Sequence, residues 1–142
     1  MKTSNVKLYS YCFNQAGFKG NAYLSSVGWY SFKACSIGGN LIITDEVREI
    51  THTFRETSVG GFIYIGKNVV SIDNQSFYGT RCDKYYIAAS TPPICKGDTA
   101  INLWGYYLGV PKGKKSTYEN AEFWKNAAII EEVDFSKLKI KP

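Results

Sequence analysis

The chain has 142 residues, of which 44% are hydrophobic, 15% aromatic and 20% charged, and its formal net charge is +5. This length and composition predict one folded domain with a real core and exclude a disordered chain. The basic surplus is spread over both halves, and no run approaches 18 apolar residues, so we expect neither a nucleic-acid-binding stripe nor insertion into a membrane.

The first 23 residues carry no apolar segment of the kind found in a signal peptide. They contain Phe13 and Phe18 but do not follow the repeat described below, so we interpret 1–23 as a partial coil or N-terminal cap. We therefore expect a chain that acts in the cytosol, in a virion, or as a mature piece of an exported protein.

Three segments between residues 24 and 82 share one pattern: an aliphatic residue, a second one three positions later, and a phenylalanine four or five positions after that. The first aliphatic residues are spaced by 23 and 22 positions, and the phenylalanines by 22 and 23. A repeat of this length predicts a solenoid whose coils stack around a shared core. The phenylalanines expected in that core are Phe32, Phe54 and Phe77.

Short apolar segments recur in phase with this pattern, and their last residues are spaced by 22, 22 and 23 positions. They predict one short strand per coil, at residues 41–43, 63–65, 85–87 and 108–110. We therefore predict an α/β or mainly β fold, a short leucine-rich-repeat solenoid with parallel strands at a period of 22–23 residues. The repeats span 24–110 of a single domain, 1–142.

The repeat ends in a segment with a different pattern. After Thr91-Pro92-Pro93, a helix is predicted at 116–127, capped by Ser116 or Thr117, with Tyr118 and Trp124 on its buried face. We interpret 111–132 as a C-terminal cap that ends in a short extended piece. Residues 133–142 alternate apolar residues with lysines, as an edge strand or a docking tail would.

The sequences SVGWYSFKAC (26–35) and SIDNQSFYG (71–79) resemble the core of the BspA-like leucine-rich repeats of bacterial surface antigens. The segment TPP (91–93), followed by VPKGKKSTYENAEFWKNAAIIEE (110–132), is similar to the C-terminal cap of that family. The resemblance implies a concave parallel sheet, no cofactor, no catalytic residues, and a role in binding partners at a cell or particle surface.

If alternate strand residues fill the core, the residues between them form a ladder on the outside of the sheet. Aromatic side chains dominate this ladder and suit partner binding, because they offer a large contact area at low entropy cost. The alternative is that they are ordinary strand residues that shield one another or lie under the N-terminal segment. The predicted partner-binding residues are Ile42, Phe62, Tyr64, Tyr86 and Tyr107.

Other chemistry is less well supported by the sequence. The four cysteines are too scattered for a zinc knuckle, and we expect buried small side chains with one possible disulfide, Cys82–Cys95. Cys35, His52 and Asp45 offer a nucleophile, a base and an orienting group, but Cys35 occupies a core position of the repeat. Carboxylates for glycosidase chemistry fall in the turns after strands: Asp45, Glu46 and Glu49, or Asp73 and Asp83.

The sequence therefore favours a non-catalytic leucine-rich-repeat module that binds a protein or glycan at a cell or particle surface. The alternative is a structural subunit of a larger assembly, such as a phage virion, with the tail Lys137–Pro142 docking on a neighbour. A hydrolase is the third possibility. The family resemblance implies a secreted or cell-surface location, although this chain shows no signal peptide. A fragment of a longer protein and a virion component are both compatible with that.

Overall fold

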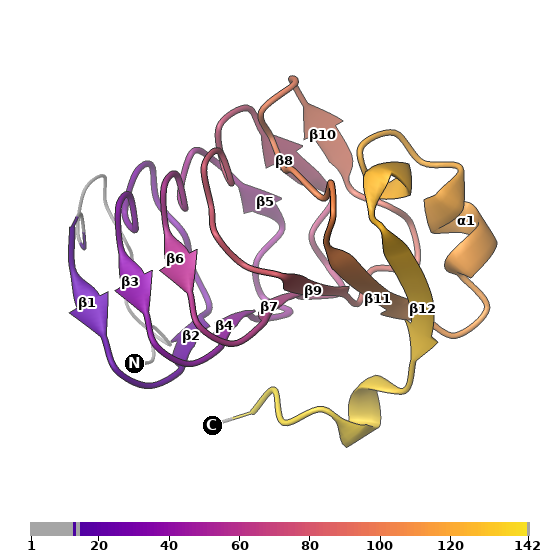
Figure 1. Ribbon diagram of the computed structural model, residues 1–142, viewed down its shortest axis with the longest axis horizontal. Coiled ribbons are helices and arrows are strands. Elements are labelled where there is room, and N and C mark those ends of the chain that lie inside the picture. The colour runs from indigo at the N-terminus through magenta and orange to yellow at the C-terminus, as the bar shows by residue number, and fades with distance from the viewer. Residues whose placement is uncertain (1–12, 14, 142) are drawn as a thin grey trace.

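The chain winds into a three-sided coil of short parallel strands (Figure 1). The computed structural model describes residue 13 and residues 15–141. Successive coils cross three sheets, called A, C and B in the order in which a coil meets them. This architecture confirms a mainly β solenoid with parallel strands and a period of about 22 residues.

Sheet A is the largest and contains one strand from every coil. Its strands are β2 (Ala22–Leu24), β4 (Leu41–Ile43), β7 (Ile63–Ile65), β9 (Lys84–Ile87), β11 (Tyr107–Pro111) and β12 (Ile129–Val133). Sheet B contains β1 (Gly17–Phe18), β3 (Ser36–Ile37) and β6 (Ser58–Val59). Sheet C contains β5 (Glu49–Ile50), β8 (Ser71–Asp73) and β10 (Ile94–Lys96).

The register of sheet A follows the repeat of the sequence. One row of paired residues belongs to the core: Leu41, Ile63, Tyr85 and Leu108. The next row lies on the outer face: Ile42, Tyr64, Tyr86 and Gly109. The coils therefore stack without slipping, and a side chain at a given position of one coil touches its counterpart in the next.

The predicted phenylalanine core is a continuous stack. Phe32, Phe54 and Phe77 are all buried, and neighbouring rings lie 5.6 and 5.3 Å apart between centroids at interplanar angles of 26° and 20°. Phe13 extends the stack at 5.1 Å from Phe32. Each such pair adds about 0.5–1.5 kcal/mol beyond the burial of its area. The described part of 1–23 is thus packed as one more coil of the solenoid.

The turns between sheets are held by buried hydroxyls and by close backbone approach. The Thr80 hydroxyl donates to the carbonyl of Phe54 at 2.8 Å, and the Thr57 hydroxyl makes the equivalent bond to Phe32 one coil earlier. At the corner from sheet B to sheet A, a Cβ on Gly60 would lie 2.4 Å from the carbonyl oxygen of Gly38. Only glycine permits the coils to approach this closely.

The C-terminal cap closes the open end of the core (Figure 1). Tyr118 and Trp124 are fully buried, and their rings meet edge to face at 5.5 Å. The Tyr118 hydroxyl donates to the carbonyl of Ala89 at 2.7 Å, and Trp124 Nε1 donates to the carbonyl of Pro93 at 3.0 Å. Both aromatic residues therefore fill the core and satisfy carbonyls of the preceding coil.

The predicted single helix over 116–127 is wrong in its extent. A short helix, α1 (Lys115–Glu119), is followed by a separate 3-10 turn, Trp124–Asn126. α1 ends at its C-cap, Asn120, and Phe123, which precedes the 3-10 turn, has a φ of 71° that is incompatible with a continuous right-handed helix. The N-cap is Lys114 rather than Ser116 or Thr117, and its own side chain makes no capping bond. A carboxylate oxygen of Glu132 accepts a hydrogen bond from the amide of Lys115 instead.

The tail is not an edge strand. Sheet A ends at β12, and Phe135–Lys137 form a 3-10 turn that begins with Asp134 accepting a hydrogen bond from the amide of Ser136. Beyond this turn, the chain runs back along sheet A toward the N-terminal strands (Figure 1). The segment 134–141 is hereafter called the tail.

Candidate interaction surfaces

The structure brings the predicted partner-binding residues together on the outer face of sheet A, but it does not leave them open. Ile42, Tyr64 and Tyr86 are only 1%, 4% and 7% exposed. Phe62 and Tyr107 are half-buried at the border of the same cluster. The expectation of an exposed aromatic ladder is therefore wrong, and the residues form a second, smaller core outside the sheet.

Two features bury this cluster. The residues shield one another, as the rings of Phe62 and Tyr86 meet edge to face at 5.1 Å and those of Tyr86 and Tyr107 at 5.8 Å. The tail then covers them, with Phe135 packed edge to face against Tyr64 at 5.8 Å. Among the described residues the covering segment is the C-terminal tail. The N-terminal cover that the sequence suggested falls on 1–12, which lie outside the described residues.

Side chains of the tail alternate between the sheet and solvent. The partly buried apolar side chains that pack on the sheet cluster are Phe135, Leu138 and Ile140, and the lysines between them are exposed. The apolar and basic alternation in the tail sequence therefore reflects one face packed on the sheet and one in water.

Gly109 lies in the same outer row as Tyr86, on the next strand. A Cβ at this position would lie 2.4 Å from the Tyr86 ring, so the ring occupies the space above the glycine.

A hollow of about 250 Å³ remains between the end of the tail and the sheet. Ile42 and Tyr64 line it together with Ile140 from the tail, and Asp45 and Glu46 stand among its lining residues. Burial, with a further contribution from the charge of Asp45, raises the pKa of Tyr64 to about 12. Tyr64 therefore remains a neutral phenol under the tail at physiological pH.

A second surface lies on the turns that lead from sheet C to sheet B, and here large side chains are exposed. Trp29 is 51% exposed and Tyr78 is 45% exposed. The Trp29 ring packs at 4.9 Å from that of His52, which meets Tyr30 edge to face at 5.8 Å. Arg55 lies over the Tyr78 ring at 5.2 Å. We call this set the turn face: Trp29, Tyr30, Lys33, His52, Arg55, Gln75 and Tyr78.

Polar contacts join the three coils of the turn face. The side-chain oxygen of Gln75 accepts hydrogen bonds from Arg55 Nη1 at 3.1 Å and from the Tyr30 hydroxyl at 3.5 Å. Lys33 lies over the Tyr30 ring at 5.6 Å, and Arg55 also pairs with Glu56 at 3.4 Å. These contacts hold the aromatic rings of the turn face in one arrangement.

Backbone strain marks the same turns. Tyr30, His52 and Gln75, at equivalent positions of three coils, have φ values of 54°, 48° and 62°. This left-handed conformation costs a non-glycine residue about 1–2 kcal/mol. Because the conformation recurs at one position of successive coils, it belongs to the geometry of the turn and sets the direction in which these three side chains point.

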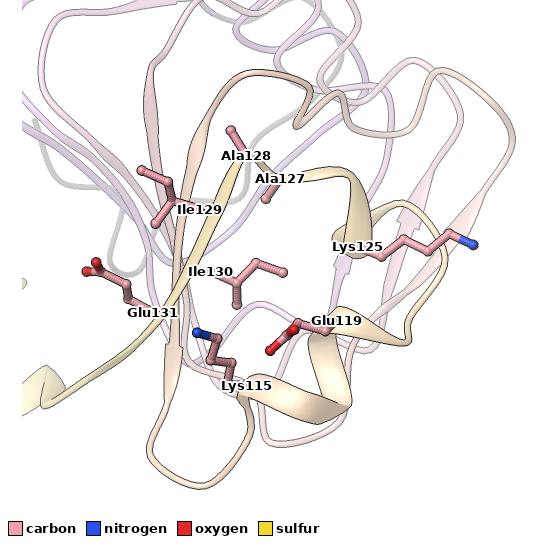
Figure 2. Close-up of a pocket in the computed structure, with 8 residues that line it drawn as sticks. All are labelled: Lys115, Glu119, Lys125, Ala127, Ala128, Ile129, Ile130 and Glu131. Carbon is pink, nitrogen blue, oxygen red and sulfur yellow. The ribbon is translucent and has the colours of Figure 1, made fainter.

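A third concave region borders the last strand of sheet A (Figure 2). It measures about 460 Å³ and lies between β12 and the segment that carries α1. Its lining mixes cationic, acidic and aliphatic side chains: Lys115, Glu119, Lys125, Ile129, Ile130 and Glu131. Charges of both signs beside an edge strand discourage pairing with another strand, so we read this region as a protected edge.

The candidate hydrolase residues belong to different sides of the coil. Cys35 is buried in the core before sheet B, and burial raises the pKa of its thiol. Asp45 follows sheet A, where it accepts a hydrogen bond from the amide of Lys67 at 2.9 Å. His52 lies in the turn after sheet C, against Trp29. The three are not arranged as a nucleophile, a base and an orienting group.

The possible disulfide between Cys82 and Cys95 is not formed. Both thiols are free; Cys82 contacts the carbonyl of Gly61 at 3.4 Å, and Cys95 contacts that of Pro93 at 3.9 Å. They lie at different places in the coil, just before β9 and within β10. Within residues 13 and 15–141, no group of three or more His, Cys, Asp or Glu residues could hold a metal ion, and no helix is long and apolar enough to span a membrane.

The turn face was not predicted from the sequence, although the spacing of the repeat places its residues at equivalent positions of successive coils. The offset of 22–23 residues that aligns the phenylalanines also aligns Tyr30, His52 and Gln75, and it aligns Lys33, Arg55 and Tyr78. Strand residues drew attention because of their alternation, whereas turn residues show no such pattern. Only the folded coil shows that these turn side chains stack into one surface.

Comparisons with protein-family models, with curated proteins and with solved structures found no match.

Proposed function

We propose that this chain is a non-catalytic binding module that contacts a protein or glycan partner through its turn face. The observation that carries the proposal is the row of exposed and half-buried aromatic and cationic side chains across three coils, with Trp29 and Tyr78 near its two ends. Single exposed apolar residues are ordinary on a protein surface, but a contiguous, pre-ordered set is typical of an interaction site.

The composition of the turn face suits tight binding. Trp, Tyr and Arg are the residue types that most often dominate the energy of protein interfaces. Their rings and the Arg55 guanidinium are already fixed by contacts with His52 and Gln75, so little side-chain entropy remains to be lost on binding. The resemblance to BspA-like repeats supports the same role and suggests a cell or particle surface as its setting.

The proposal is tested with full-length protein carrying Trp29→Ala and Tyr78→Ala together. The matched control is Trp104→Ala, because Trp104 is 69% exposed but belongs to the loop before β11. Immobilised wild-type and variant proteins are incubated with extract or surface fractions from the source organism and, separately, with a glycan array. Thermal unfolding of each variant checks that it is folded.

We expect the wild type and the Trp104→Ala variant to retain the same partner or glycan, and the turn-face variant to lose at least tenfold in retention. Two exposed hot-spot residues at about 2 kcal/mol each are sufficient for such a loss. Equal retention by all three proteins would rule out the turn face as the contact surface.

A second candidate function is a structural subunit of a larger assembly, such as a virion. The observation in its favour is the tail, a basic and apolar segment that packs onto a sheet through its side chains.

A further inference from the structure

The tail is joined to sheet A mainly by apolar packing. Its backbone hydrogen bonds run within the tail, from the amide of Lys137 to the carbonyl of Asp134 and from that of Leu138 to Phe135. A long hydrogen bond, 3.5 Å from the Tyr23 hydroxyl to the carbonyl of Lys141, also links the tail to β2. A surface segment held largely by apolar side-chain packing is expected to open at a lower free-energy cost than the strands of the core.

The surface that the tail leaves is a candidate site for a new contact. Ile42, Tyr64 and Tyr86 form a small contiguous apolar patch once uncovered, and patches of this kind often mark interaction sites. The segment shown to fit the patch is 134–141, through Phe135, Leu138 and Ile140. Another copy of the chain carries the same segment and the same patch.

Opposite charges also favour the tail as the segment that covers the patch. At the far end of the tail, Lys141 shares the hollow of about 250 Å³ with Asp45 and Glu46. A hydrogen bond from the Thr44 hydroxyl lowers the pKa of Glu46, so its carboxylate stays ionised at neutral pH. An acidic border beside an apolar floor favours a segment that alternates lysines with apolar residues over an acidic one.

We propose that the outer face of sheet A is an interface between copies of this chain, in which residues 134–141 of one copy replace the tail of the other. Reciprocal exchange gives a closed pair, and one-way exchange gives a chain of subunits. In dilute solution the chain's own tail wins, because its connection to β12 keeps it at an effective concentration of about millimolar. Exchange takes over where copies are concentrated, as in an assembly.

This inference is independent of the turn face, because it concerns a different surface and a different occupant. Tail exchange would give a structural subunit a defined contact with its neighbour, between residues 134–141 and the outer face of sheet A. It can be tested with this chain alone, without an outside partner. Failure of tail exchange would leave the turn-face proposal intact.

The test uses two full-length variants that complement each other. Leu138→Asp with Ile140→Asp disables the tail but keeps the sheet face, and Tyr64→Lys disables the face but keeps the tail. Each variant alone lacks one half of the contact and is expected to sediment as the 15.9 kDa monomer. Mixed at equal concentration, they are expected to form a heterodimer of twice that mass, because the free tail of one meets the free face of the other.

The control is a chain with all three substitutions, which is expected to pair with neither variant. A synthetic peptide of residues 134–141, titrated into the tail-disabled protein and followed by the NMR signals of Tyr64 and Tyr86, measures the same contact even if Tyr64→Lys does not fold. A peptide carrying both aspartates should bind at least tenfold more weakly. A mixture of folded variants that stays monomeric, or a peptide that leaves both tyrosines unperturbed at millimolar concentration, would overturn the proposal.

Discussion

At the scale of single residues, the repeat is maintained by backbone conformations as much as by side chains. Ala34, Glu56 and Gly79 occupy one turn position in three coils and have φ values of 53°, 59° and 68°. Glycine adopts this conformation freely, and other residues adopt it at a cost. The same structural demand is thus met by three different residue types.

This position offers a pair of substitutions with opposite effects. Ala34→Gly should raise the free energy of unfolding by about 0.5–1 kcal/mol, because relief of strain exceeds the added entropy of the unfolded chain. Gly79→Ala should lower it by about 1 kcal/mol. Denaturant unfolding of both variants checks the prediction, and equal signs for the two changes would contradict it.

The buried phenols predict how stability depends on pH. A tyrosine in the unfolded chain ionises near pH 10, whereas the pKa of Tyr64 in the fold is raised to about 12, first by burial and then by Asp45. Between these values the unfolded state loses its proton first, so stability falls as pH rises above about 10. Below pH 10 this contribution is fully present.

Thermal unfolding midpoints measured from pH 9 to pH 12 would show this decline. In Tyr64→Phe the decline should be shallower, because one of the buried phenols no longer titrates, and the remainder comes from groups such as Tyr85 and Tyr118, whose pKa values burial also raises. Identical profiles for the two proteins would mean that Tyr64 is not covered by the tail.

At the scale of elements, the cap and the tail are fixed by different forces. Trp124 and Tyr118 seal the core with both packing and hydrogen bonds to carbonyls of the preceding coil. The tail lies outside the sheet and relies on apolar packing. We therefore expect the cap to unfold with the whole molecule and the tail to open separately.

Trp124→Ala should lower the free energy of unfolding by about 3–5 kcal/mol, because it leaves a cavity at the end of the core. Trp124→Phe keeps much of the ring but leaves the Pro93 carbonyl without its donor, and should cost about 1–3 kcal/mol. Calorimetry or denaturant unfolding measures both. A negligible change in Trp124→Ala would show that the residue does not plug the core.

The elements also show why some sequence-based predictions held and others failed. Strands and core phenylalanines were predictable because stacking forces each of them to recur at the repeat offset. The length of the helix was not, since α1 ends at Glu119 with Asn120 as its C-cap, and the spacing of Tyr118 and Trp124 looks the same with or without this interruption. The place of the tail was not predictable either, because alternation looks the same for an edge strand and for a segment lying on a sheet.

At the scale of the whole molecule, the three sides of the coil have different roles. The inner rows of all three sheets make one core, the outer face of sheet A is covered by the tail, and the turns between sheets C and B present the turn face. The repeat in the sequence predicted the coil, but it also predicted exposed residues on the outer face of sheet A, and these are buried. Their burial depends on where the tail lies, and no local pattern carries this information.

The central claim is that an outside partner contacts the turn face, whereas the face of sheet A belongs to the tail. The most direct test is the affinity of one identified partner for two folded variants, Trp29→Ala/Tyr78→Ala and Tyr64→Ala/Tyr86→Ala. We expect the first to weaken binding at least tenfold and the second to leave it within about twofold of the wild type, since two lost hot-spot contacts exceed 1.4 kcal/mol. Unchanged binding by the first variant together with lost binding by the second would contradict the account.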